Sequence, residues 1–254
     1  MEFEQIKKEV GGSRYDFLRI SPTLGKNIVL LGLAGSHAYG TEHPGSDLDI
    51  RGIATNTKAN IITFRDFNQI VDTSTDTVIY SFDKMIKLFS SCNPSAIELL
   101  GLKKEHYLYV NDVGHLLLNN SNVFLSKAAV NSYGGFIGHM KKRMLSMSES
   151  DREKRKIAKH MAHPVRLYYT AFDLFEKGQI ITYRSNEHEL LMSILNCDYL
   201  NEDKQPKQEF LDMVNELDAR MEYAVEHTVL PDKANTDGIL AMQEIVNTSI
   251  IFNA

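Results

Sequence analysis

The chain has 254 residues, of which 43% are hydrophobic and 24% are charged, and its formal net charge is −5. This balance is ordinary for a globular protein and argues against wholesale disorder. No stretch approaches the roughly 18 uninterrupted apolar residues that a membrane helix needs, so we expect no membrane association.

The cysteines and the first residues point to a reducing compartment. Cys92 and Cys197 lie far apart and neither has a CxxC partner, so we predict neither a zinc site nor a disulfide framework. The segment MEFEQIKKEVGG is short of apolar residues and lacks the pattern of a signal peptide. We therefore expect a cytoplasmic protein with free thiols.

The first hundred residues predict strands mixed with helices. Short apolar or alternating runs predict four strands, at residues 27–33, 47–56, 61–64 and 77–82. Residues 83–91 then change to helical spacing. Asn93-Pro94 ends that helix, because the residue before proline avoids the α region, and Asn93 or Ser95 can cap a short helix that follows.

The chain changes character after about residue 110. Helical spacing recurs in segments 125–147, 152–177, 187–195, 205–226 and 235–251, which predicts a helical bundle. We expect a mixed α+β fold, with a small sheet-based catalytic domain in residues 1–115 followed by an all-helical C-terminal domain in residues 116–254. The boundary is predicted only to within residues 105–125.

A pair of carboxylates carries the chemistry. Asp47 and Asp49 alternate with the apolar Leu48 and Ile50, and residues i and i+2 of a strand project from the same face. The two carboxylates would stand side by side while the apolar side chains enter the core. Adjacent like charges favour a bound cation, and Mg²⁺ (or Mn²⁺) held with the triphosphate oxygens of an NTP is the natural occupant.

Gly35 and Ser36 follow the first predicted strand. Small residues let the backbone turn sharply and offer N–H groups to a phosphate, and the Ser36 hydroxyl is a further donor. A helix beginning near His37 would add its N-terminal dipole. The ten residues that follow would bring the second strand back beside the first, which places the carboxylates next to this turn.

Three other interpretations compete for this segment. An EF-hand loop also begins D-x-D, but Lys58 occupies the position of the bidentate glutamate. A P-loop would need a lysine where Thr41-Glu42 follows Gly40. A surface hairpin with solvated aspartates remains open, although it does not explain why turn, alternation and carboxylates occur together.

Three blocks of sequence, in this order, match a known family. GSHAYGTEHPGSDLDIRG, YSFDKMIKLFSSCNPSAIELL and KHMAHPVRLYYTAFDLFEKGQI resemble the predicted nucleotidyltransferase family of bacteria and phages that is assigned to an RNA repair pathway. That family belongs to the DNA polymerase β-type superfamily, and the resemblance covers roughly residues 30–240. It implies a palm-like mixed sheet with flanking helices, and transfer of a nucleoside monophosphate from an NTP with loss of pyrophosphate.

The resemblance also implies a third carboxylate from a later strand. Asp76 opens the run DTVIYSF and is our prediction, joining Asp47 and Asp49 on the metal and drawing the proton from the incoming hydroxyl. Asp83 is the second choice, although it stands at a helix start where capping explains it. Asp72 is a further choice in a polar loop.

A basic segment lies further along the chain. Residues 139–166 hold nine Lys/Arg against three Asp/Glu, and a helical projection of 152–177 places cationic side chains in one stripe: Lys156, Lys159, His163 and Arg166, with His160 at its edge. The opposite side carries Ile157, Met161, Val165, Tyr168 and Phe172. We expect Pro164 to kink or divide this helix.

Spacing alone leaves open whether this stripe is a solvated face. The family's K-H-x-x-H-x-x-R-L element, matched by residues 159–167, favours contact of Lys159 and Arg166 with the triphosphate or the acceptor's phosphate, and His160 is assigned to the same group. His160 and His163 lack a third ligand for a metal. From the same resemblance, Asn93 is expected to be a cap and Glu98 the partner of a basic residue.

The leading hypothesis is an enzyme that transfers NMP to an RNA end. A second hypothesis has a protein or a small molecule as the acceptor, and a third has a non-catalytic nucleotide-binding module. The third would be indicated by loss of the carboxylates, and both are present. The sequence leaves the oligomeric state and the preferred base undetermined.

Overall fold

A computed structural model of the chain describes residues 3–145 and 153–253. Within them, the strands form one five-stranded mixed sheet of order β3-β4-β2-β1-β5. The strands are β1 (Ile28–Leu33), β2 (Ile50–Ala54), β3 (Gln69–Asp72), β4 (Thr77–Ser81) and β5 (Tyr107–Val110). β1 is antiparallel to β2 and β5, β4 is antiparallel to β3, and β2 runs parallel to β4.

The parallel pair decides what lies beside the carboxylates. In its register Ile50 is the partner of Thr77, so the residues just before β2 and just before β4 meet at the same edge of the sheet. β1 is antiparallel to β2, and its carboxyl end, Leu33, is the partner of Ile50. The turn after β1 therefore reaches this edge too.

The sheet has a core on each face. β1 sends Leu30 into a large cluster that includes Phe89, Phe175 and Val246. It sends Leu31 into a smaller cluster around Tyr15 and Leu18. The large cluster is continuous from the sheet to the C-terminal helices, and it spans the predicted boundary between residues 115 and 116.

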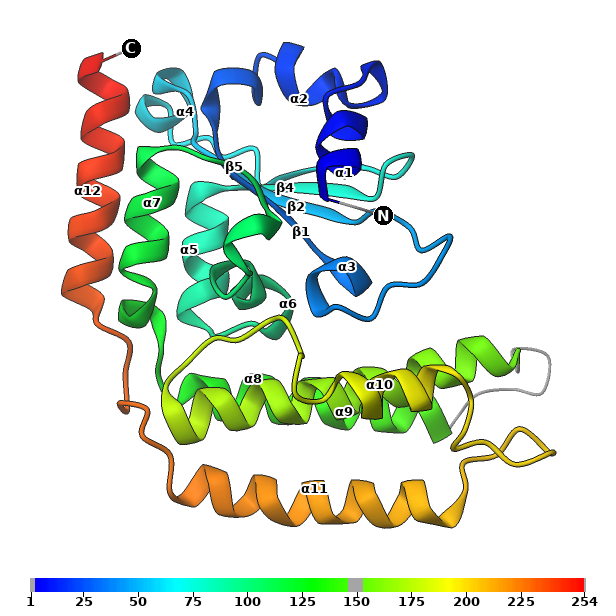
Figure 1. Cartoon of the computed structure of the whole chain (residues 1–254). Coiled ribbons are helices and arrows are strands. Elements are labelled where there is room, and N and C mark those ends of the chain that lie inside the picture. The colour runs from blue at the N-terminus through cyan, green and yellow to red at the C-terminus, as the bar shows by residue number, and fades with distance from the viewer. Residues whose placement is uncertain (1–2, 146–152, 254) are drawn as a thin grey trace.

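Short helices accompany the sheet. They are α1 (Phe3–Val10), α2 (Phe17–Ile20), α3 (Gly35–Tyr39), α4 (Lys58–Ile62), α5 (Phe82–Ser90), α6 (Pro94–Ile97) and α7 (Asp112–Asn119). The longer helices α8 (Ala128–Leu145), α9 (Lys154–Lys177), α10 (His188–Leu195), α11 (Gln208–Glu226) and α12 (Thr236–Asn253) follow. In Figure 1, α8 to α11 form a layer beneath the sheet, and α12 turns back to lie beside α7.

Most of the predicted elements are confirmed, which establishes the α+β fold. The five long helices agree with the predicted segments to within three residues at every end that is described. The predicted end at Met147 and start at Arg152 lie outside the described residues. α9 packs against α8, α10 and α11, and it runs through Pro164 without dividing.

One predicted strand is wrong. Residues 61 and 62 are the last two of helix α4, and residues 63 and 64 form the turn that follows it. A helix forms here because the Thr57 side chain accepts a hydrogen bond from the Asn60 backbone N–H and caps its N-terminus. The segment does not contribute a buried strand to the core, since the Phe64 side chain is 97% exposed. Strands β3 and β5, helices α1, α2 and α7, and the one-turn 3-10 helices were not predicted. None of the described helices combines the length and apolar character of a membrane span.

Candidate active site

The turn after β1 is built around a close approach of a carboxylate to the backbone. Gly35 has a φ of 59°, and a Cβ placed on it would lie 2.1 Å from Oδ2 of Asp49. Only glycine combines that backbone conformation with that contact. Helix α3 begins at Gly35 itself, two residues before the predicted start, and its single turn ends at Gly40 in the left-handed conformation.

Asp47 and Asp49 lie just before β2 rather than within it. Leu48 and Ile50 are buried, so the predicted alternation is confirmed: the apolar side chains enter the core while Asp47 is exposed and Asp49 half-buried. The Ala34 N–H donates to the Asp49 carbonyl oxygen over 2.9 Å. This bond ties the carboxylates to the turn that holds Ser36.

The Asp49 carboxylate is partly buried and lies near other negatively charged side chains. Burial raises the pKa of its carboxyl, and the charges of Asp76 and Asp47 raise it further, against the opposing effect of Arg51. The Arg51 Nη2 atom lies 3.8 Å from Asp49 Oδ1. A divalent cation at this edge would offset the repulsion between the carboxylates.

Of the three choices for the further carboxylate, Asp76 lies beside Asp49. It directly precedes β4, and its carbonyl oxygen accepts hydrogen bonds from the Ile50 N–H over 3.2 Å and from Arg51 Nη1 over 2.8 Å. Its side chain is exposed and its φ is 47°.

The other two choices have structural roles in this arrangement. Asp83 lies at the opposite end of β4, where its carboxylate accepts a hydrogen bond from Asn56. It is not the cap that the sequence suggested, because Ser81 caps α5. Asp72 accepts hydrogen bonds from Ser74 and Thr75 and closes its own loop, which lowers the pKa of its carboxyl.

The donor set fits Mg²⁺ in one specific way. Within residues 3–145 and 153–253, no three His, Cys, Asp or Glu side chains form a group that could hold a metal ion by themselves. Mg²⁺ does not require one, because it is commonly held by one or two carboxylates together with substrate phosphates and water. Asp47 and Asp49 line one cavity and meet that requirement.

That cavity has a volume of about 540 Å³ and lies between the two halves of the fold. Ser36, Asp47 and Asp49 line it from the sheet side. Lys159 and Arg166 line it from α9. Residues more than a hundred positions apart, which the sequence assigned to one site, therefore border one space.

The remaining predicted members differ in position. Asp76, His160 and Gly35 do not line the cavity, whereas His163 does. Burial, with the charges of Arg166 and His160, lowers the pKa of His163 to about 3. His163 is therefore a neutral imidazole at ordinary pH. The predicted packing face is confirmed, since Ile157, Met161, Val165, Tyr168 and Phe172 are all buried.

Lys159 and Arg166 present their charges differently. Lys159 is exposed and forms no ion pair with another described residue, so its ammonium group is available to a ligand. Arg166 is 4% exposed and pairs with Glu98, which confirms the basic partner expected for Glu98. The Nε atom of Arg166 has no hydrogen-bond partner among the described residues.

A clamp of three side chains joins α9 to the turn that carries Ser36. The guanidinium carbon of Arg166 lies 3.6 Å from the centre of the Tyr39 ring. The Tyr39 hydroxyl donates to Glu98 Oε2 over 2.8 Å. Asn93, as expected, caps α6 just before Glu98. The position of α3, and with it the Gly35-Ser36 turn, is therefore fixed by a buried ion pair between Glu98 of the sheet half and Arg166 of the helical half.

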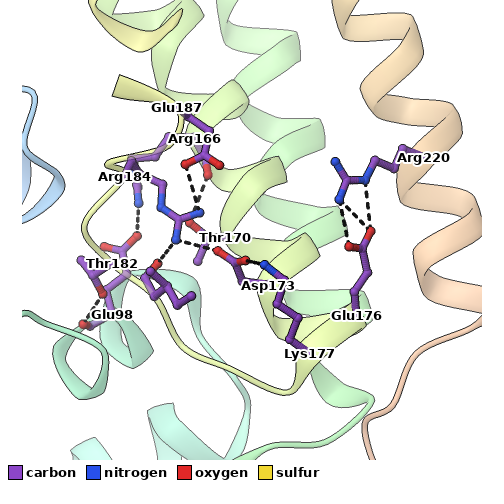
Figure 2. A network of polar contacts seen from close by, with 11 residues as sticks. Glu98, Arg166, Thr170, Asp173, Glu176, Lys177, Thr182, Arg184, Glu187 and Arg220 are labelled. Carbon is purple, nitrogen blue, oxygen red and sulfur yellow. Dashed lines mark hydrogen bonds and ion pairs between the residues drawn. The ribbon is translucent and has the colours of Figure 1, made fainter. Parts of the chain in front are cut away.

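Residues 178–187 reinforce this clamp, and nothing in the sequence predicted their role. Thr182 donates to the Glu98 carbonyl oxygen over 2.6 Å, and the Arg184 N–H donates to the Tyr39 carbonyl oxygen over 3.0 Å. The Arg184 side chain is buried and pairs with Asp173 over 2.7 Å. Figure 2 shows the contacts of Thr182 with Glu98 and of Arg184 with Asp173 beside the Arg166–Glu98 pair. A single arginine in a polar loop has no periodic signal that could have revealed them.

Comparison with known proteins adds a family to this geometry. The sequence matches the RNA repair pathway DNA polymerase beta family (RlaP) over residues 2–245. No curated protein gives a significant match.

Proposed function

Because the chain belongs to the RNA repair pathway DNA polymerase beta family, we propose that it is a nucleotidyltransferase that transfers NMP from an NTP to a hydroxyl at an RNA end. The observation that carries this proposal is the shared cavity. It gathers two carboxylates, the Ser36 turn and the cations of α9, which is the combination that phosphoryl transfer needs.

A divalent ion is part of the proposal. Asp47 and Asp49 would hold Mg²⁺ (or Mn²⁺) together with oxygens of the triphosphate. When bound, the ion would orient the α-phosphate and neutralise charge on the attacking and leaving oxygens. Asp76 is proposed as the third carboxylate because it lies beside Asp49 and raises the pKa of that carboxyl.

The chain's own residues would divide the rest of the work. The hydroxyl oxygen of the acceptor forms a bond to the α-phosphorus, the bond to the bridging oxygen breaks, and pyrophosphate leaves. The hydroxyl proton passes to a carboxylate at this edge of the sheet, and Asp76 is proposed as that carboxylate. Ser36 and Lys159 would bind the triphosphate, with Arg166 fixing the turn and offering its free Nε to the same anion.

RNA is the proposed acceptor because of the charge at the cavity. Lys154, Arg155 and Lys159 are exposed and border it, in a chain whose net charge is −5. A local cationic surface on an acidic protein favours one polyanion at one place. His160 would belong to this surface rather than to the cavity.

The test is a transfer assay that separates the acceptors. Purified protein is incubated with Mg²⁺ or Mn²⁺, each α-labelled NTP and a cell extract, and label is measured in RNA, protein and soluble metabolites. We expect label in RNA. Label confined to protein or to a metabolite would replace the acceptor, and absence of label in all three fractions with every NTP would refute the proposed reaction.

A further inference from the structure

One wall of the cavity has no role in the reaction described above. Leu191, Met192 and Leu195 of α10 line it, opposite in character to the charged residues of the loop before β2 and of α9. Helix α10 packs against α9, and Leu191 is buried. The apolar wall is therefore held in place by the same helix that supplies the cations.

A polar group stands at the end of this wall. Asn196 follows α10 directly, and its backbone N–H donates to the Met192 carbonyl oxygen over 2.8 Å. Its side chain is exposed and lines the cavity. The amide makes no hydrogen bond with the part of the chain that the structure describes, and it offers both a donor and an acceptor.

The charged side and the apolar side of the cavity match the two ends of a nucleotide. A triphosphate with its cation suits the carboxylates, Ser36 and Lys159. A nucleobase has two apolar faces and an edge of donors and acceptors, which suits the apolar wall with an amide at its end. The volume of about 540 Å³ is within the range of about 300–1,000 Å³ usual for small-molecule sites.

We propose that the apolar wall of α10 binds the nucleobase of the NTP and that Asn196 reads the edge of that base. The inference rests on the proposed function for the identity of the ligand. It adds a specificity-determining residue and a second half to the binding site.

The first test compares two methionines. Binding of each of the four NTPs, as α,β-methylene analogues with Mg²⁺, is measured by calorimetry for the full chain, for Met192→Ala and for Met213→Ala. Met213 is the matched control, because it is also partly buried but lies on α11 outside the cavity. Loss of base contact should weaken binding of the analogues about tenfold in Met192→Ala and leave Met213→Ala unchanged.

Inorganic triphosphate provides the second arm of this test, since it has no base. Its affinity should be equal in the wild type and in Met192→Ala. If Met192→Ala bound triphosphate as much more weakly as it bound the analogues, the substitution would disturb the phosphate site. That result would overturn the base assignment. The base assignment would also be overturned if Met192→Ala bound the analogues as tightly as the control Met213→Ala does.

The third arm tests Asn196. Asn196→Ala should reduce the ratio between the tightest-bound and the weakest-bound base, by about tenfold if one hydrogen bond to the base is lost. Asn119→Ala is the control, because Asn119 is likewise exposed at the end of a helix. An unchanged ratio, or a wild type that binds all four bases equally, would refute the reading by Asn196.

The outcomes separate this inference from the reaction. If the analogues bind as predicted while no acceptor is labelled, the base site stands and the transfer reaction falls. If RNA is labelled while Met192→Ala behaves as its control, the reaction stands and the base site falls. A chain that binds none of the four analogues refutes both.

Discussion

The buried pair between Glu98 and Arg166 makes a quantitative prediction. In Glu98→Gln the guanidinium of Arg166 would keep its place without a counter-charge, and its side chain is only 5% exposed. Removing one partner of a buried ion pair costs about 3–5 kcal/mol. The amide oxygen of glutamine can still accept one of the two hydrogen bonds that Tyr39 and Arg166 now make to Glu98, so we expect about 3 kcal/mol.

An exposed pair in the same protein is the control. Glu176 pairs with Arg220 over 2.9 Å, with side chains 33% and 48% exposed, and such pairs contribute about 0–1 kcal/mol. Urea unfolding followed by circular dichroism measures both variants. Glu98→Gln should lose at least about 2 kcal/mol more than Glu176→Gln. Equal losses would refute the claim that the clamp holds the two halves of the fold together.

The site yields three more predictions, which concern Gly35, His163 and Lys159. Gly35→Ala should lower transfer at least about tenfold, because its Cβ displaces Asp49. Gly178→Ala is the control: Gly178 has a φ of 65°, its Cβ would meet Val229 at an ordinary 3.6 Å, and it lies outside the cavity, so the substitution should only cost about 1 kcal/mol of stability. Equal activities would contradict the role of the turn. His163 has a folded pKa of about 3, below its ordinary value. The unfolded chain therefore takes up a proton below about pH 6.5 that the folded chain does not. The free energy of unfolding consequently decreases as the pH is lowered. Between pH 7 and 4.5 the wild type should lose about 2 kcal/mol more than His163→Gln in urea unfolding; parallel losses would show that His163 is not the cause. Lys159→Met should raise the KM for NTP about tenfold with little change in Tm, and an unchanged KM would remove Lys159 from the triphosphate site.

The sequence predicted those parts of the fold that local pattern determines. The long helices have apolar faces that repeat over several turns, so segments 205–226 and 235–251 correspond to α11 and α12. Residues 61–64 failed because four apolar residues do not distinguish a strand from a helix. β3 and β5 were missed because they are four-residue strands at the two edges of the sheet.

The site was predictable where one motif contains its residues. Asp47, Asp49 and Ser36 fall within fourteen residues, and α3 together with the register of β1 and β2 brings them to one edge. The contacts of Arg184 with Asp173 and Tyr39 join segments that no local pattern connects. The apolar wall of α10 was predicted only as a helix, because its side chains would serve a core equally well.

The central claim is that Asp47 and Asp49 hold the catalytic metal for transfer of NMP. The direct measurement is the rate of label transfer from α-labelled NTP to RNA with Mg²⁺, for the wild type and for Asp47→Asn/Asp49→Asn. We predict that the double variant loses transfer by at least about a thousandfold while its Tm is equal to or above that of the wild type, because repulsion between the carboxylates is relieved. Transfer at the wild-type rate by a folded double variant would contradict the account.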